Sequence, residues 1–457
     1  MALGKRQEPQ QEFWVPTEML SKTPGHPFYV QLDRVLKDAG FDAFVENLCA
    51  EFYKDGGRPG IPPGTYFRMH FVGYFEGIDS ERGIAWRCAD SLSLRDFLNI
   101  PFHKPTPDHS SLSVIRSRFK KETHEQVFAW ILELLAKHEL VTGKTVGIDA
   151  TTLEANAAMR SIVRRDTGES YDEFLTRLAK ASGIENPTKQ DLINLDKKRD
   201  KKGSNDDWEH PHDPDAKIAK MKDGSTHLAH KAEHAVDLDT GAILGVTLQS
   251  ADMGDTQTLP HTIAEAAANL EAIHQNPEVK DALHPNWLSE AVTDKGYHSN
   301  GTLVELEEYE IRPYLSEPDR GPRKWEGKEK EQKATYGNRR RIKGARGKRL
   351  FKKRAELVER TFAHCYETGG MRRTHLRKHE NILKRLLNHV GGFNLSLILR
   401  KLIGYGSPRE LYNAGKSLIF SIFGVGTRWG TWEWVTSAFD KFAQAAKTNT
   451  TKICAAT

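Results

Sequence analysis

The sequence predicts an α/β protein in which a mixed sheet covered by helices follows an all-α region. From residue 26 to about residue 136, apolar residues recur at helical spacing, as in Leu32, Val35 and Leu36. From Lys144 onward, short apolar runs alternate with helical stretches in the order strand, hairpin, helix, strand, helix, strand, helix. This order predicts parallel and antiparallel neighbours in one sheet.

The bulk composition narrows the class of protein. The chain has 457 residues, enough for two or three domains, and its four cysteines show no paired spacing, which favours reduced thiols over a secreted disulfide framework. No apolar run approaches the roughly 18 to 20 residues that span a bilayer, and the amino terminus has no apolar signal region. We therefore expect a cytoplasmic protein with no membrane partner.

Charge is distributed unevenly along the chain. From Arg320 to the end there are 31 Lys and Arg against 10 Asp and Glu, so this part carries +21, while the first 319 residues carry −16. A basic end on an acidic body predicts a polyanionic partner.

These patterns predict a division of the chain into four parts. We expect a flexible arm, a helical domain that binds DNA, an α/β domain with a charged, mostly helical insert and a mobile basic loop, and an accessory segment of unassigned role. In order, these are residues 1–25, 26–140, 141–403 (with the insert at 160–225 and the loop at 320–354) and 404–457.

One helix of the first domain carries a candidate DNA-contacting face. Asp108 or Ser110 is a good helix cap, and Arg116 and Arg118 follow near one polar face. A recognition helix of helix-turn-helix type and a solvated face of a helix bundle both fit this pattern.

Three carboxylates lie at the ends of predicted strands or on a predicted helix beside the sheet. The strand at 145–148 leads to Asp149, and the strand at 288–293 ends in Asp294, just before Gly296. A helix that begins near Glu356 carries Glu359 at the edge of its apolar stripe. Acidic groups at strand ends lie where a substrate reaches the sheet.

Three such carboxylates suit hard divalent cations. Mg²⁺ prefers oxygen ligands and takes few carboxylates from a protein. Two ions about 4 Å apart can activate water and hold the leaving oxygen in phosphodiester cleavage. We expect Mg²⁺ or Mn²⁺, as two ions, at Asp149, Asp294 and Glu359.

The basic loop at 320–354 contains sixteen Lys or Arg and three Glu, and it joins the Asp294 unit to the Glu359 helix. Because it must lie near their site, phosphate contact is the favoured interpretation over a solvated run. The cationic residues predicted to contact DNA, in this loop and elsewhere, are Arg116, Arg118, Lys295, Arg339, Arg340, Arg341, Lys343, Arg360, Arg372, Arg373 and Arg377.

Three histidines lie on the first strand of a predicted hairpin, which turns at Asp239 to Gly241. Strand alternation places His230 and His234 on one face and His227 on the other, with no fourth ligand nearby in sequence. We therefore do not expect zinc at these histidines.

At this point the chain resembles bacterial insertion-sequence transposases of the DDE class, over roughly residues 26–403. The segments that carry the resemblance are Gly147-Ile-Asp149-Ala-Thr-Thr, His230-Lys-Ala-Glu-His-Ala-Val-Asp237, Val292-Thr-Asp294-Lys-Gly-Tyr-His298 and Glu356-Leu-Val-Glu359-Arg-Thr-Phe-Ala-His.

The resemblance implies a ribonuclease H-like catalytic core that uses magnesium. It implies DNA transposition by an oligomer, a homodimer or larger, on double-stranded DNA, with cleavage at terminal inverted repeats and strand transfer into target DNA. A nucleoid-associated location in the cytoplasm follows. Some relatives carry Tyr, Arg and Lys around the glutamate, but those positions hold Lys352, Ala355 and Tyr366 here.

Two other functions stay open. One is a catalytically inactive DNA-binding repressor or architectural protein derived from a transposase, which needs the basic surfaces and no metal. The other is a plain metal nuclease, which makes no joined product.

Overall fold

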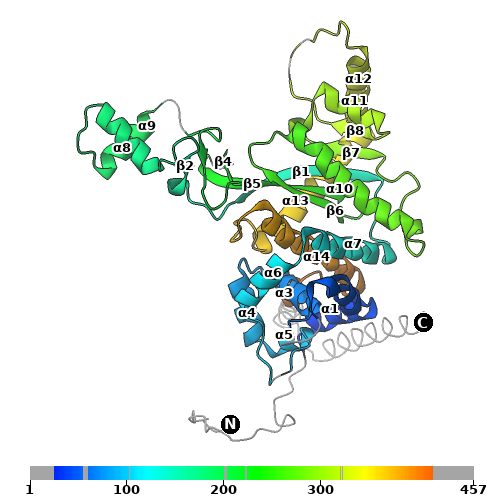
Figure 1. The fold of residues 1–457 in the computed structure, drawn as a ribbon. Helices are drawn as coiled ribbons and strands as arrows, with labels where there is room; N and C mark the ends of the chain where they lie inside the picture. The colour runs from blue at the N-terminus through cyan, green and yellow to red at the C-terminus, as the bar shows by residue number, and fades with distance from the viewer. Residues whose placement is uncertain are drawn as a thin grey trace, which may run out of the picture.

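A computed structural model describes residues 25–54, 60–101, 103–199, 203–221, 224–319, 321 and 323–414. Residues 1–24 of the predicted arm and residues 415–457 of the predicted accessory segment lie outside this range. At the centre is a six-stranded mixed sheet (Figure 1). Its strands are β1 (Thr145–Glu154), β4 (Lys217–Lys220), β5 (Thr226–Asp237), β6 (Ile243–Ser250), β7 (Glu290–Thr293) and β8 (Arg312–Leu315).

The strand order is β4-β5-β1-β7-β8, and β6 also pairs with β5. Strand β5 runs antiparallel to β1, β4 and β6, whereas β1, β7 and β8 are parallel neighbours. The predicted hairpin joins β5 to β6, and Gly241 takes the left-handed backbone conformation at φ 82° that a glycine adopts without strain.

Helices cover the sheet on both faces. Alternate residues of β5 point to opposite sides: Glu233 reaches Thr262 on α10 (Asp255–Gln275), and His234 reaches Thr361 on α13 (Ala345–Phe362). The mixed sheet with its helices, preceded by a helical region, confirms the predicted α/β fold class.

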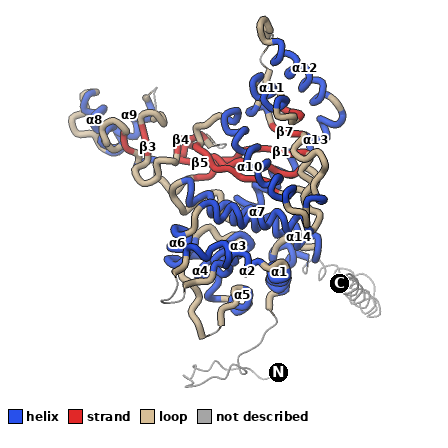
Figure 2. Tube along the Cα trace, turned by 45° about the vertical axis from the view of Figure 1, so that its right-hand side comes forward, coloured by secondary structure: helices blue, strands red, loops and turns tan. Residues whose placement is uncertain are grey.

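Among the described residues, seven α-helices precede the sheet. The tube view of Figure 2 shows most of them as a separate layer below it. They are α1 (Pro27–Asp38), α2 (Phe41–Cys49), α3 (Pro63–Glu76), α4 (Glu81–Asp90), α5 (Leu92–Phe97), α6 (His109–Arg118) and α7 (Lys121–Lys137). The cap predicted for α6 is Asp108, whose carboxylate accepts the Ser111 N–H at 2.8 Å.

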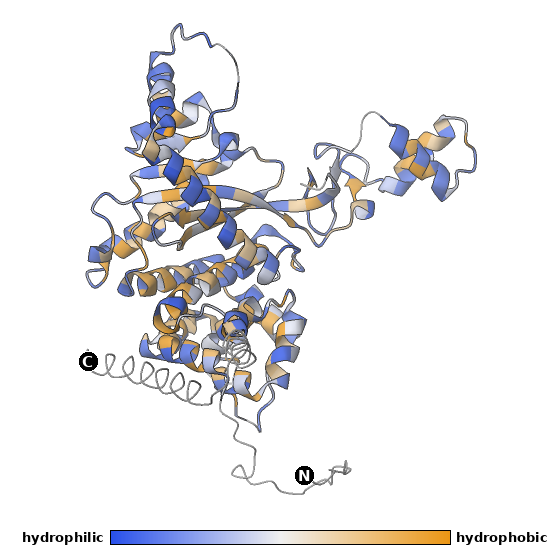
Figure 3. Ribbon diagram, turned by 180° about the vertical axis from the view of Figure 1, so that it is seen from behind, coloured by the Kyte–Doolittle hydropathy of each residue, from blue (hydrophilic) through white to orange (hydrophobic). Residues whose placement is uncertain are grey.

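The last described long helix, α14 (His379–Ile403), lies with α7 between the sheet and the N-terminal helices (Figures 1 and 2). Apolar residues, orange in Figure 3, gather along these central helices. Because Gly391 and Gly392 have no side chains, Ile131 of α7 and Tyr74 of α3 can pack directly against α14. One continuous apolar core therefore crosses the predicted domain boundary at residue 140.

The charged insert projects from the end of the sheet (Figure 1). It has a small apolar cluster of its own, in which Trp208 is 3% exposed and packs on Tyr171 and Phe174. Besides β4, which joins the main sheet, its helices and strands are β2 (Val163–Arg164), α8 (Tyr171–Ala181), α9 (Lys189–Lys198) and β3 (Trp208–Glu209).

The prediction of a mobile basic loop over residues 320–354 is wrong for most of its length. Helix α12 (Glu329–Lys343) and the first half of α13 occupy it, after α11 (Asn300–Glu308) and β8. Gly347 lets the start of α13 pack on the backbone of Arg341 and Ile342, where a Cβ would clash, so this glycine forms a tight helix corner.

Within the described ranges, no helix is both long and apolar enough to cross a membrane.

Candidate active site

The structure brings Asp149 and Asp294 together on neighbouring strands. Strands β1 and β7 are parallel, with Gly147 paired to Val292. Two residues further along each strand comes an aspartate, so Asp149 and Asp294 lie side by side. The Asp149 side chain is 25% exposed, and Asp294 is half-buried at the carboxyl end of β7.

The pKa of Asp294 reflects its burial first and the neighbouring charges second. Burial raises the pKa of Asp294 above its usual value, and the negative charges of Asp149 and Asp255 raise it further. The Gly296 N–H, which donates to Asp294 Oδ1 at 2.9 Å, and the Arg354 guanidinium act in the opposite direction. Asp294 is therefore protonated more easily than an ordinary aspartate, chiefly because it is partly buried and secondarily because two carboxylates lie near it.

Arg354 of α13 neutralises Asp149. Its Nη1 donates to Asp149 Oδ2 at 2.7 Å, and its side chain is only 13% exposed. Gly147 makes this approach possible, because a Cβ there would lie 3.2 Å from Arg354 Cγ and closer still to Leu238.

Sequence reasoning missed Arg354 because it lay in the run interpreted as a mobile loop. Leu350 and Val358, four residues to either side, are buried, and that i, i+4, i+8 spacing places all three on one helix face. This spacing is the signal that could have identified the arginine.

Glu359, the third predicted ligand, is carried by the same helix but is not brought to the pair. It lies five residues after Arg354, about 7.5 Å along the helix axis and turned by roughly 140° about it. Glu359 is exposed, whereas Arg354 and Val358 point toward the sheet. Among the described residues, no three His, Cys, Asp or Glu side chains stand close enough together to hold a metal ion.

The histidines of β5 have other partners. His234, opposite Asp149 in the β1–β5 register, contacts Thr361 Oγ1 at 2.9 Å and the Tyr366 hydroxyl at 2.6 Å. Burial lowers the pKa of His234 to about 3, so it is neutral. His230 is buried beside Asp213, with 3.4 Å between Nε2 and Oδ2.

The predicted DNA-contacting cations take several positions. Half-buried Arg339, Arg341 and Arg372 pair with acidic side chains, and Arg372 also donates to Thr151 Oγ1 on β1 at 2.9 Å, two residues past Asp149. The exposed members of the set are Arg118, Lys295, Arg340, Lys343, Arg360, Arg373 and Arg377.

Arg116 departs from its predicted role. It is 8% exposed, and its guanidinium pairs with Glu81 of α4 and donates to Ser113 Oγ at 3.0 Å. Since both partners belong to the same helical region, the structure assigns Arg116 to the packing of that region rather than to a DNA surface.

The residues at the end of β7 fit a divalent cation. Asp149 and Asp294 supply oxygen donors, which hard cations prefer, and burial, with a smaller contribution from the Asp149 charge, raises the pKa of Asp294. A cationic group, the Arg354 guanidinium, already binds Asp149. The two aspartates are the residues that would hold the ion.

Comparison with known families gives two matches. Residues 17–118 match a transposase domain family (DUF772), and residues 205–395 match the transposase DDE domain. Together the matches cover more than half of the chain; Asp294 and Glu359 lie inside the second, and Asp149 lies between the two. No curated protein and no solved structure matches. The mixed sheet and its helices are consistent with the ribonuclease H-like core of this class.

Proposed function

Since the chain belongs to the DDE transposases of insertion sequences, we propose that it cuts DNA at transposon ends and joins the freed ends to target DNA. Transposition makes DNA its partner, and members of this class typically use divalent metal ions.

One observation supports the proposal most. Asp149 and Asp294 converge from strands that are far apart in sequence, and their charges interact through a partly buried site. Two carboxylates brought together in this way destabilise the ion-free protein, so their placement needs a functional reason. Holding a divalent cation supplies that reason.

A divalent cation bound there would polarise the scissile phosphate and activate the attacking oxygen. The chain's own residues bind and orient the DNA. Arg372 is fixed beside β1 by Thr151 and Glu367, and α12 and α13 present exposed cations such as Arg340, Lys343 and Arg360. These side chains offer phosphate contacts on elements that are rigid because they are helical or anchored to the sheet.

Glu359 stays the proposed third ligand on the strength of the family resemblance. In this structure Glu359 is exposed and does not form a three-residue group with the aspartates, so it would have to turn toward Asp149 when the ion and DNA bind. The pairing of Arg354 with Asp149 would have to open in the same step.

The same two features favour a second candidate function. An aspartate neutralised by arginine and a glutamate that is not grouped with the aspartates also suit a DNA-binding protein that derives from a transposase and no longer cuts. Such a protein would act as a repressor or an architectural factor, and it would need no divalent ion.

One experiment separates the two functions. The purified chain is incubated with end-labelled linear duplexes taken from both flanks of its coding region, with Mg²⁺ or Mn²⁺ or without either ion. A transposase nicks and then joins these duplexes only with the ion, a nuclease nicks without joining, and a DNA-binding protein only shifts their mobility. Wild-type protein that binds the duplexes and never nicks them contradicts the proposal.

The residue assignments need matched variants. We expect Asp149→Asn, Asp294→Asn and Glu359→Gln each to abolish cleavage and to leave DNA binding in place. Glu356→Gln is the control for cleavage, because Glu356 is also exposed and lies three residues from Glu359 on the same helix. It also frees Arg360, with which Glu356 pairs at 2.7 Å, so the DNA affinity of both variants is measured beside their cleavage. If Glu359→Gln cleaves as well as Glu356→Gln, Glu359 is not a ligand.

A further inference from the structure

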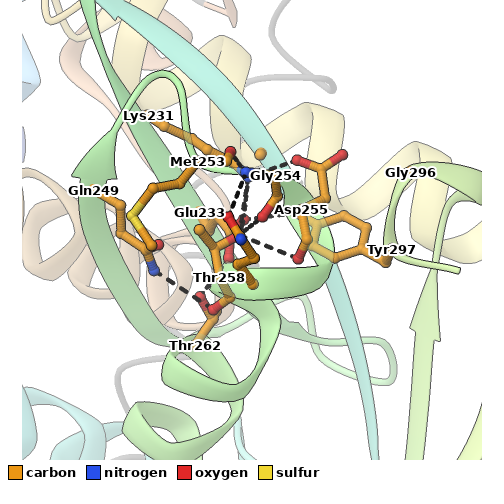
Figure 4. A network of polar contacts seen from close by, with 12 residues as sticks. Lys231, Glu233, Gln249, Met253, Gly254, Asp255, Thr258, Thr262, Gly296 and Tyr297 are labelled. Carbon is orange, nitrogen blue, oxygen red and sulfur yellow. Dashed lines mark hydrogen bonds and ion pairs between the residues drawn. The ribbon is translucent and has the colours of Figure 1, made fainter. Parts of the chain in front are cut away.

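A buried network of charged and hydroxyl groups lies on the α10 side of the sheet, next to the Asp294 turn (Figure 4). Val146, Ile148 and Ala235 on the same sheet face are fully buried and apolar. Because an ionised group in such a setting is costly unless every partner is present, the network calls for a functional explanation.

Glu233 is the centre of the network. It is fully buried in the middle of β5. Its carboxylate accepts hydrogen bonds from the Tyr297 hydroxyl at 3.1 Å, from Thr262 Oγ1 at 2.6 Å and from Thr258 Oγ1, and it lies 3.0 Å from Lys231 Nζ. Donors from β5, α10 and the turn after β7 therefore meet on one carboxylate.

Lys231 links this buried carboxylate to a second one. Its ammonium donates to Asp255 Oδ1 at 2.5 Å, to Thr258 Oγ1 at 2.9 Å and to the Met253 carbonyl at 3.4 Å. The ammonium also lies 5.9 Å from the centre of the Tyr297 ring, within the range of a cation–π contact. Lys231 thus fixes the start of α10 against the turn that carries Tyr297.

The network reaches Asp294 by two routes. Tyr297, whose ring is 1% exposed, follows Asp294 by three residues and is anchored on Glu233. Gly296 sits against Asp255: a Cβ there would clash with Asp255 Oδ2 and come within 3.2 Å of Asp294 Oδ1. Both Asp255 and Asp294 therefore border the same small space beside the glycine.

We propose that Tyr297, Glu233 and Lys231 are positioning residues that hold the Asp294 carboxylate in the place where it binds a divalent cation. The inference rests on the proposed function, because it concerns the ligand of that same site. The three residues do not touch DNA or the ion; they act through the short turn from Asp294 to Tyr297. Partners that orient a metal ligand from outside typically change metal affinity by 10- to 100-fold when they are removed.

Tyr297→Phe is the most informative variant, since it removes one hydroxyl and keeps the buried ring. Mn²⁺ binding to the full chain without DNA is measured by electron paramagnetic resonance, alongside the melting temperature. We expect Tyr297→Phe to weaken Mn²⁺ binding by about tenfold. We also expect Mn²⁺-dependent cleavage to need a correspondingly higher ion concentration, with the affinity for DNA unchanged.

Two controls separate positioning from simple stability. Tyr314→Phe removes a buried tyrosine hydroxyl that donates to Glu290 at 3.4 Å, on the strand next to β7. Thr262→Val removes another donor of Glu233 without touching the turn after Asp294. Both variants are expected to lower the melting temperature and to leave Mn²⁺ affinity within a factor of two of the wild-type value.

The outcomes are distinct. The inference is overturned if Tyr297→Phe binds Mn²⁺ as tightly as wild type, or if Thr262→Val and Tyr314→Phe weaken binding as much as it does. If the wild-type chain shows no Mn²⁺ binding that Asp294→Asn abolishes, the metal-dependent function fails as well, and the positioning role fails with it. Should Tyr297→Phe not fold, Lys231→Met is tested in its place by the same criteria.

Discussion

Replacement of Arg354 by glutamine is the perturbation whose effect the structure defines most sharply. Arg354 Nη1 donates a hydrogen bond to Asp149 Oδ2 at 2.7 Å. Asp149 is also one of the two side chains that would hold a divalent cation. The arginine and the cation compete for the same negative charge. We therefore expect Arg354→Gln to bind Mn²⁺ more tightly than wild type when DNA is absent, even though the variant loses a favourable ion pair.

The magnitude follows from the pair itself. The two side chains are 13% and 25% exposed, so solvent screens the interaction only in part. A hydrogen bond to a charged group contributes about 1.5–3 kcal/mol, and we take about 2 kcal/mol as the amount the ion must displace. At about 1.4 kcal/mol per factor of ten, removing the competitor raises Mn²⁺ affinity by about 30-fold. The ion-free variant should melt at a lower temperature, which Mn²⁺ restores.

The assay is a Mn²⁺ titration followed by electron paramagnetic resonance, with Arg346→Gln as the matched control. Arg346 lies on the same helix, about 12 Å earlier along its axis, and pairs with Glu290 at 2.5 Å. We expect Arg346→Gln to lower the melting temperature and to leave the Mn²⁺ affinity unchanged. An Arg354→Gln affinity equal to or weaker than that of wild type would refute the competition between arginine and cation.

Three more predictions concern the same sheet and its insert. The pKa of Asp294 is raised in the folded protein. Its contribution to stability is therefore present below the ordinary aspartate pKa and is lost as the pH rises through the raised value. In the absence of divalent ions, we expect Asp294→Asn to have a higher melting temperature than wild type at pH 7 and the same melting temperature in acid. Equal melting temperatures at pH 7 would contradict this sign. Gly296→Ala should clash with Asp255 and weaken Mn²⁺ binding at least tenfold, whereas Gly301→Ala, at an open helical position, should leave binding unchanged in the same titration. Trp208→Ala removes the buried ring of the insert and destabilises the insert by about 3–5 kcal/mol. Limited proteolysis should then cleave the variant first within residues 160–220, while Mn²⁺ binding persists. Unchanged proteolysis would show that the fold of the insert does not depend on this ring.

The sheet was predictable because its strands are short apolar runs with clear ends. The strand before Asp294 and the hairpin turn at Gly241 could be predicted from the residues of those segments alone. The helices over residues 329–354 were not predictable in the same way. Leu350 is one of few apolar residues there, and the buried contacts of Asn338, which bonds the Leu315 backbone at 2.8 and 3.1 Å, exist only after the strand is in place.

The pairing of Asp149 with Asp294 could be predicted, since parallel neighbours bring strand ends to one edge of a sheet. The helix register around Glu359 could not. Its orientation depends on which face of α13 packs on β1, and Gly147 and Arg354 decide that through a close approach visible only in three dimensions. The network at Lys231 also escaped prediction, because a lysine and a glutamate two residues apart on a strand normally indicate a solvated face.

The place of α14 in the structure sets a condition on how the protein is made. The N-terminal helices, complete at residue 137, pack against α14, which begins at residue 379. A ribosome adding roughly 5–20 residues per second needs about 10–50 s to synthesise the intervening segment. For that interval the sides of α3 and α7 that face α14 lack this partner, so the nascent chain exposes apolar surface there. The helical region reaches its native packing only in a molecule that already contains the strands of both aspartates.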